Sequence, residues 1–290
     1  MSFFFQLAIS GLAIGCVYAL IALGFVIVFK STGVLNFAQG DMMMVGAFMT
    51  YTLSSSRGWP FGAALAATLI GSFLFGFVVE RLVLRRMVGQ PVFSVIIVTI
   101  GLGWLLRGVA GMAFGHSEAR IVFPFSGDSV TIGSVTLSAE NVATIAVTAV
   151  AFIAFFIFFR RSRWGVAMRA TASNQDVAQL MGINVNRITA IAWGLAGVLG
   201  TLAGVVLGML GFLFIHVGDT ALRAFPAAVL GGLDATGGAV VGGALLGIAE
   251  TLFGGYFGGS YRELMAWILL IVVLLVRPFG LFGSKDIERV

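Results

Sequence analysis

A polar segment between two long apolar runs decides the fold of this chain. Residues 142–159 read VATIAVTAVAFIAFFIFF, residues 160–184 read RRSRWGVAMRATASNQDVAQLMGIN, and residues 188–215 read ITAIAWGLAGVLGTLAGVVLGMLGFLFI. An apolar run of about 18 or more residues is long enough to cross the hydrocarbon core of a bilayer as a helix. The pattern predicts two membrane helices joined by an arginine-rich segment that lies outside the membrane.

The arginine-rich segment carries the signals of a short helix of its own. Ser173 can act as the N-cap, and Asp176, three residues later, completes a capping box. Gly182 predicts the end of the helix, because glycine enters the left-handed conformation without steric cost. Two interpretations are open: a helix presented to a partner protein, or an ordinary solvated loop helix.

The composition excludes a soluble globular protein. The chain has 290 residues, of which 59% are hydrophobic and 10% charged, and its mean hydropathy is +1.07. Such a chain is an integral membrane protein, and its runs have helical length rather than the alternation of a β-barrel. We predict one all-α polytopic domain over residues 1–290 with about eight membrane segments. Cys16 is the only cysteine, so no intramolecular disulfide forms and no zinc site is expected.

The remaining apolar runs follow the same pattern. They cover residues 5–29, 61–79, 92–114 and 264–276, and the last can extend backwards through residues 258–263. Between the fourth and fifth runs, residues 116–141 are polar. There VTI (130–132) and VTL (135–137) flank Gly133 and Ser134, which predicts a small β-hairpin. Gly200, Gly204 and Gly208 share one face of the run at 188–215, which predicts close helix packing.

The basic residues predict the orientation of the chain. Eleven of the 17 lie in three regions that helix parity places on one face, and the positive-inside rule makes that face cytoplasmic. The N-terminus and the hairpin at 116–141 are then periplasmic, whereas the loop at 160–187 and the C-terminus are cytoplasmic. The eleven are Arg81, Arg85, Arg86, Arg160, Arg161, Arg163, Arg169, Arg187, Arg277, Lys285 and Arg289.

Two segments are too short or too polar for an ordinary span. Parity requires residues 224–253 to enter the membrane and return, and 30 residues are too few for two full spans of about 20 residues each. We therefore expect a re-entrant pair of half-helices broken at GGLDATGG (231–238). Residues 34–54 form a second interrupted element. One such element in each half indicates an inverted-repeat transporter with its pathway at the breaks.

Polar residues within these elements are candidates for the pathway, because polar groups inside a membrane are costly and often functional. Asn36, Gln39 and Asp41 are the first group, although Asp41 could instead cap a helix at the cytoplasmic interface. Asp234 could cap a half-helix or touch the solute. Arg107 could snorkel, pair with an acid such as Glu250 or line the path, and we favour the pair. His116 and His216 fall near external helix ends, and no catalytic residue or metal ligand is expected.

Several motifs resemble those of bacterial branched-chain amino acid ABC permeases, and of the shorter of their two permease subunits. They are GVLNFAQGD (33–41) with Gly46-Ala47, Arg169-Ala170 with Asn174 and Ala178, Gly182-Ile183-Asn184, Ala196-Gly197, Ala203-Gly204, and FPAAVLGG (225–232). They run in order along nearly the whole chain.

The resemblance implies an importer of branched-chain or related apolar amino acids in the bacterial inner membrane. It implies a second homologous permease, two cytoplasmic ATPases that hold ATP and Mg, and a periplasmic binding protein, with no cofactor in this chain and no nucleic-acid partner. The short helix then resembles the coupling motif of ABC importers, with Asp176 for Glu and Val177 for the first Ala. The residues assigned to ATPase coupling are Arg163, Arg169, Ser173, Asn174, Asp176, Ala178, Gly182 and Asn184. Those assigned to the translocation path are Asn36, Phe37, Gln39, Asp41, Gly231, Gly232 and Asp234.

Two other classes of protein remain as alternatives. A self-contained secondary transporter or channel for a small polar solute, such as urea or an amide, predicts paired acids in the membrane, whereas the acids here are scattered. An intramembrane enzyme predicts clustered His, Asp, Ser or Cys. No Gly-x-x-x-x-Gly-Lys-Ser/Thr sequence occurs in the chain, so an ATP-driven mechanism needs a separate motor.

Overall fold

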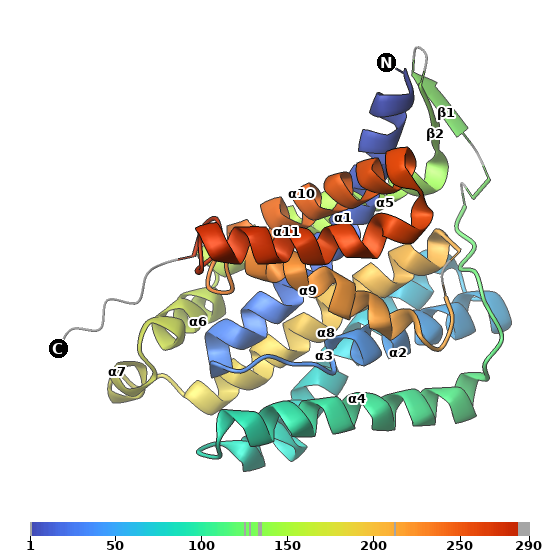
Figure 1. The fold of residues 1–290 in the computed structure, drawn as a ribbon. Coiled ribbons are helices and arrows are strands. Elements are labelled where there is room, and N and C mark those ends of the chain that lie inside the picture. Colours follow the sequence, from blue (N-terminus) through green and yellow to red (C-terminus); the bar gives the residue numbers. More distant parts are fainter. Residues whose placement is uncertain (1, 125, 128, 133–134, 212, 284–290) are drawn as a thin grey trace.

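The computed structural model describes residues 2–124, 126–127, 129–132, 135–211 and 213–283. Within them, seven helices are long and apolar enough to cross a membrane, the last together with the 3-10 turn η4 (Gly259–Tyr261) before it. Every apolar run of the sequence therefore forms a helix, as predicted (Figure 1). The seven are α1 (Ser2–Thr32), α3 (Phe61–Leu82), α4 (Val92–Phe114), α5 (Ala139–Arg161), α8 (Val185–Met209), α10 (Thr236–Phe257) and α11 (Arg262–Val276).

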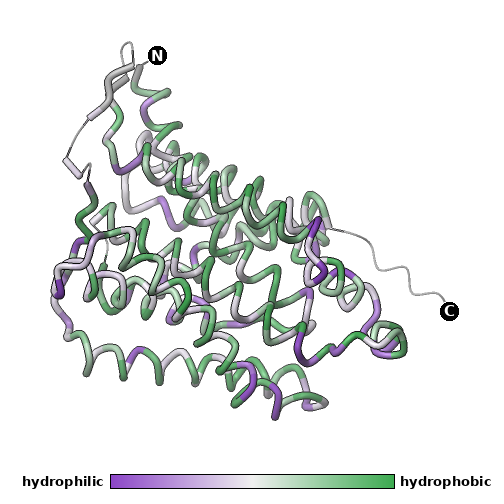
Figure 2. The backbone as a smooth tube through the Cα atoms, turned by 180° about the vertical axis from the view of Figure 1, so that it is seen from behind, coloured by the Kyte–Doolittle hydropathy of each residue, from purple (hydrophilic) through white to green (hydrophobic). Residues whose placement is uncertain are grey.

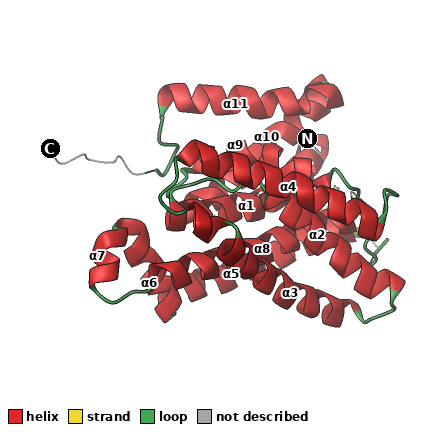
Figure 3. Ribbon diagram, turned by 90° about the horizontal axis from the view of Figure 1, so that it is seen from below, coloured by secondary structure: helices red, strands yellow, loops and turns green. Residues whose placement is uncertain are grey.

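The helices α1 and α8 form the centre of the molecule. Both are buried along most of their length, whereas α4 and α11 expose large apolar side chains and lie at the periphery (Figure 3). Glycines bring the neighbours of these two helices close. A Cβ atom added to Gly243 of α10 would lie 2.5 Å from the Cα of Ala19 in α1, and one added to Gly197 of α8 would lie 2.6 Å from the carbonyl oxygen of Ser72 in α3. The predicted glycine face of α8 is confirmed as a close-contact face, packed on residues 39–47 and Ile121.

Two helices are about half the length of a membrane span. They are α2 (Gln39–Tyr51), which continues into the π-helical turn η1 (Thr52–Ser56), and α9 (Thr220–Gly231), which follows the 3-10 turn η3 (Val217–Asp219). The first turn of α2 meets η3 inside the molecule, because Gly40 lies directly against the carbonyl oxygen of Gly218. The breaks that lie within the bundle are therefore the segments before α2 and before α9.

This arrangement corrects the expectation for residues 224–253. The break between α9 and α10 lies near the expected glycines, but α10 has 22 residues and is a helix of membrane length rather than a half-helix. Of these two helices, only α9 is a half-helix. It begins inside the bundle, whereas α10 continues to Phe257. Gly231 and Gly232 lie against the C-terminal segment, where the amide of Phe282 donates to the carbonyl of Gly231 at 3.3 Å.

The packing relations of the two halves mirror each other. Helix α1 packs along α10, and correspondingly α8 packs along α3. The short helix α2 contacts α4 and α8, while α9 contacts α11 and α1. Helices α1 and α8 also run in opposite directions through the bundle (Figure 1). This exchange of partners is the arrangement that an inverted repeat of four helices produces, in agreement with the sequence prediction.

The two ends of the bundle differ in character. At one end, beside the N-terminus, β1 (Ser129–Ile132) pairs antiparallel with β2 (Val135–Ser138), as predicted, and the turn at Gly133 and Ser134 lies outside the described residues (Figure 1). Arg120, in the loop that precedes this hairpin, pairs with Glu140 of α5 at 2.8 Å. The other end carries two short helices, α6 (Arg163–Ser173) and α7 (Gln175–Leu180). Hydrophilic residues gather mostly at these ends and in the loops (Figure 2).

Candidate functional site

Three capping residues divide the arginine-rich segment into helices. The side-chain oxygens of Ser162, Asn174 and Asn184 accept hydrogen bonds from the amides of Gly165, Val177 and Arg187, at 2.9, 3.0 and 3.0 Å. Each residue is the N-cap of the next helix: α6, α7 and α8 in turn. The segment is therefore a helix–helix unit that projects from the bundle, with α7 at its tip (Figure 1).

The predicted cap of α7 is wrong by one residue. Ser173 is the last residue of α6, and Asn174 is the N-cap because its backbone is extended, with φ −161°. With this cap, Asp176 lies at the second helical position, and residue 177 at the third is valine, so no capping box forms. The predicted stop at Gly182 is confirmed. Its φ is +81°, and the amide of Ile183 donates to the carbonyl of Ala178 across the turn.

Helix α7 presents apolar side chains to its surroundings. Ala178 is buried against the rest of the unit, whereas Val177, Leu180 and Met181 are exposed, the last two by 86% and 78%. Asp176 is exposed in the first turn. On its inner side, the side-chain amide of Gln175 donates through Nε2 to the backbone carbonyl of Ser31 at the end of α1, at 3.1 Å. This hydrogen bond links α7 directly to the end of α1, just before the segment that leads into α2.

The arginines of this segment differ in their surroundings. The guanidinium of Arg169 donates to the carbonyl of Phe159 and lies 5.5 Å from the centre of its ring, so Arg169 satisfies the C-terminal end of α5. Arg187 lies 5.0 Å from the ring centre of Trp164, which holds α6 against α8. Arg163 is exposed beside them and lines a shallow hollow with Asn184.

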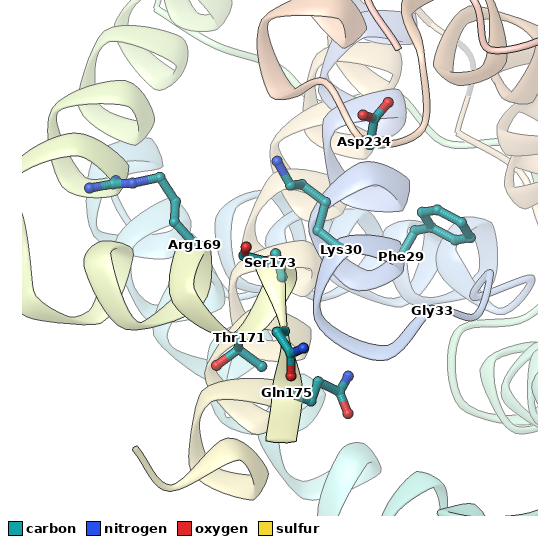
Figure 4. Close-up of a pocket in the computed structure, with 10 residues that line it drawn as sticks. Phe29, Lys30, Gly33, Arg169, Thr171, Ser173, Gln175 and Asp234 are labelled. Atoms are coloured by element: carbon teal, nitrogen blue, oxygen red, sulfur yellow. The ribbon is translucent and has the colours of Figure 1, made fainter. Parts of the chain in front are cut away.

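A pocket of about 460 Å³ lies where this unit meets the bundle (Figure 4). The side chain of Lys30 extends toward the loop that carries Asp234, and Arg169 points away from it (Figure 4). Asp234 therefore belongs to the arginine-rich end and does not join Asp41. The lining residues are Phe29, Lys30, Gly33, Arg169, Thr171, Ala172, Ser173, Asn174, Gln175 and Asp234.

The polar residues before α2 are buried and hydrogen-bonded. The side-chain oxygen of Asn36 accepts from the amide of Ala38 at 3.0 Å, and Gln39 donates to the carbonyl of Ala196 in α8 at 2.9 Å. Both side chains are completely buried. They hold the first turn of α2 in place, while Phe37 and Asp41, from the same segment, line a separate pocket against α4.

Arg107 pairs with different acids from the one expected. Its Nε donates to Asp41 at 3.0 Å and its Nη2 donates to Asp219 at 2.7 Å, whereas Glu250 lies beside Tyr18. Asp41 is consequently in a buried ion pair at the start of α2 and is not a cap at the cytoplasmic interface. Sequence reasoning missed Asp219, because nothing in the local pattern of residues 216–223 distinguishes it.

His216 belongs to the same cluster. Its Nδ1 lies 3.3 Å from Nη1 of Arg107 and 3.6 Å from a carboxylate oxygen of Asp219. Trp104, one helical turn before Arg107, lies 5.1 Å from the guanidinium carbon. Among the described residues, no group of three or more His, Cys, Asp and Glu is arranged to hold a metal ion.

Comparisons with known proteins agree with this architecture. A family described as "branched-chain amino acid transport system / permease component" matches residues 7–274. The high-affinity branched-chain amino acid transport system permease protein BraD of Pseudomonas aeruginosa is 35% identical over 301 residues, which cover 99% of this chain and 98% of that protein. The corresponding protein LivH of Escherichia coli (strain K12) is 34% identical over 303 residues, with the same coverage.

A solved structure shares the fold. A chain of PsaBC from Streptococcus pneumoniae in complex with Fab superposes with a TM-score of 0.51 at 19% identity, and the match covers 96% of this chain and 93% of that one. Sequence and fold therefore agree over almost the whole length. The chain belongs to the family of permease components of branched-chain amino acid transport systems.

Proposed function

We propose that this chain is one of two permease subunits of an ABC importer that carries branched-chain amino acids across the bacterial inner membrane. ATP and Mg bind to two separate cytoplasmic ATPase subunits, and a periplasmic binding protein delivers the solute. The family and its relatives support the transported class, and the seven membrane-length helices support a multi-pass protein in the lipid bilayer.

The observation that carries the proposal is the form of α7. A six-residue helix that exposes Leu180 and Met181 outside the apolar spans has a surface that water solvates poorly. Caps at both ends and the contact between Gln175 and Ser31 hold this helix in a defined position. These features suit a rigid coupling element that docks in a groove of an ATPase, with Asp176 at its rim.

The distribution of arginine supports one orientation in the membrane. Arg160, Arg161 and Arg163 lie at the end of the bundle that carries α6 and α7, which we place in the cytoplasm. The N-terminus and the β-hairpin lie at the opposite end (Figure 1), which we place in the periplasm, where the binding protein would dock.

A second permease subunit would cover the face formed by α4, α9 and α11. This face carries large exposed apolar side chains, among them Ile100, Leu222 and Trp267, together with the charged cluster around Arg107. Charged groups at this depth do not face lipid hydrocarbon without a high cost. A homologous subunit on this face would enclose the cluster in a pathway between the two chains.

The test is purification of the chain from its native membrane in mild detergent, followed by mass spectrometry and reconstitution. We expect a second permease, two ATPase subunits and a binding protein to co-purify, and the reconstituted assembly to transport leucine only with ATP. A chain that purifies alone and transports solute without ATP would instead support a secondary transporter or a channel.

A further inference from the structure

The charged cluster around Arg107 lies inside the bundle rather than at its surface ends. Arg107 comes seven residues before the last residue of α4, which places it about 10 Å from that end along the helix axis. Its partners come from the first turn of α2 and from η3, immediately before α9. The N-terminal ends of α2 and α9 therefore both lie at the guanidinium of Arg107, which α4 carries.

The two carboxylates hold Arg107 in different ways. Asp41 is enclosed: Cβ atoms added to Gly103 and Gly218 would lie 2.5 and 3.0 Å from its oxygens, so only the absence of these atoms leaves it room. Asp219 is open, with 47% of its side chain exposed. Asp41 thus anchors the Nε edge of Arg107, while Asp219 and His216 lie on the accessible edge.

The accessible edge lies between two pockets. One, of about 320 Å³, is lined by Phe37, Ile100, Leu222 and the cluster itself; the other, of about 510 Å³, is lined by Gly111, His116, Ile215 and His216. Trp104 and Arg107 line both. A solute that passes from one pocket to the other along this face must therefore pass the guanidinium and Asp219.

The charges of the cluster complement both ends of an amino acid. One guanidinium faces two carboxylates, so the cluster offers an acidic partner to an incoming ammonium group. Within the described part of the chain, Nη1 of Arg107 contacts only the imidazole of His216, which makes it the most exchangeable of the donors. A carboxylate can replace that contact with a stronger, charge-assisted hydrogen bond.

We propose that Arg107 and Asp219 are a transient docking point for the zwitterionic end of the solute. The α-ammonium binds the carboxylate of Asp219, the α-carboxylate accepts from Nη1 of Arg107, and the aliphatic side chain lies in the apolar pocket beside Phe37 and Leu222. Asp41 is a positioning residue that holds Arg107. This inference rests on the proposed function, because it takes an amino acid as the solute.

The first test uses the complete importer in proteoliposomes with its binding protein. Asp219→Asn retains an acceptor for Arg107 and removes the charge that the ammonium needs. We expect leucine transport to fall about tenfold while the complete complex is still recovered in the same amount. Glu263→Gln, in the exposed pair that Glu263 forms with Arg223, is the matched control and should transport like the wild type.

Two results of this test would overturn the docking point. One is wild-type transport by Asp219→Asn, and the other is a loss of transport that matches a loss of assembled complex, which indicates a structural ion pair. Failure of the wild-type importer to transport leucine would instead reject the proposed function, so the two failures are distinguishable.

A second measurement needs neither the binding protein nor turnover. Leu222→Cys in a Cys16→Ala background places a reactive thiol in the pocket of the complete permease–ATPase complex in nanodiscs. We expect millimolar leucine to slow its modification by a methanethiosulfonate reagent, and isocaproate, which lacks the ammonium, to leave the rate unchanged. Equal protection by the two compounds, or no protection by leucine, would contradict the proposal.

Discussion

Glycine acts in this chain chiefly through the Cβ atom that it lacks. At Gly243 the backbone of α1 occupies the position of that atom, with the Cα of Ala19 at 2.5 Å, so α10 and α1 are in backbone contact there. Membrane helices associate without a strong hydrophobic driving force, and close backbone approach gives them dispersion contacts instead. The packing of α10 on α1 thus depends on single missing methyl groups.

Gly243→Ala should separate α1 from α10 and lower the stability of the protein. Overpacking of this kind costs about 1–3 kcal/mol, because neither backbone can move aside cheaply. The measurement is the midpoint temperature of thermal unfolding in detergent. Gly237→Ala in the same helix is the control, since in the described part of the chain no heavy atom beyond its own helical turns lies within 4 Å of its added Cβ. Equal midpoints for the two variants would show that this contact does not limit stability.

At the scale of elements, α7 is defined by its caps rather than by its six residues. A helix of this length is unstable in isolation, because nucleation costs more than a few hydrogen bonds return. Asn174 satisfies its first turn, and the turn at Gly182 satisfies its end. The rigidity of the proposed coupling element therefore lies in residues that flank it.

Asn174→Ala should destabilise α7 by about 1 kcal/mol, because the amide of Val177 loses its acceptor. Hydrogen exchange of the amides at 175–182 in the purified protein reports this change directly. Ser173→Ala, one residue earlier, should leave the exchange of these amides unchanged. A larger effect at Ser173 than at Asn174 would return the cap to the position that the sequence predicted.

Asp176→Arg tests the docking of α7 on its partner. Asp176 is exposed in the first turn, so the substitution reverses a charge on the proposed interface without removing a buried contact. We expect solute-stimulated ATP hydrolysis by the reconstituted importer to be lost. Glu118→Arg makes the same change of charge at the exposed loop near the hairpin and should preserve stimulation. Full stimulation in the Asp176 variant would remove this residue from the coupling surface.

At the scale of the whole molecule, the two ends of the bundle differ in structure. The half-helices α2 and α9 meet inside, at the charged cluster, while the hairpin and the α6–α7 unit lie at opposite ends (Figure 1). The contact between Gln175 and Ser31 links the α6–α7 end to the segment that precedes α2. This chain of contacts offers a physical route between the proposed motor-facing end and the interior.

The orientation can be tested by labelling from one side of the membrane. Ser173→Cys and Ser117→Cys, each in a Cys16→Ala background, place one thiol at each end of the bundle, and both positions are exposed. In intact cells with a permeable outer membrane, an impermeant maleimide should label Cys at position 117 and leave position 173 unlabelled until the inner membrane is opened. The reverse pattern would invert the proposed topology.

Of the seven membrane-length helices in the described residues, the sequence alone determined all except α10. The prediction for residues 92–114 coincides with α4 at both ends, and the strands of the hairpin match as well. These features follow from local properties: the bilayer sets the length of an apolar run, and glycine permits the turn at Gly182. The shift of the α7 cap from Ser173 to Asn174 shows the limit of such signals. Both residues can act as an N-cap, but α6 extends through Ser173, so Asn174 caps α7.

Only the tertiary structure decided which distant groups meet. Arg107 lies 66 residues from Asp41 and 112 from Asp219, and their pairing depends on where α2 and α9 begin inside the bundle. The same is true of α9 and α10. Because α9 begins inside the bundle, it covers only half of a span, whereas α10 is a helix of membrane length. Such contacts arise from the rotation and depth of packed helices, which are set by side-chain fit between elements and leave no periodic signal in the chain.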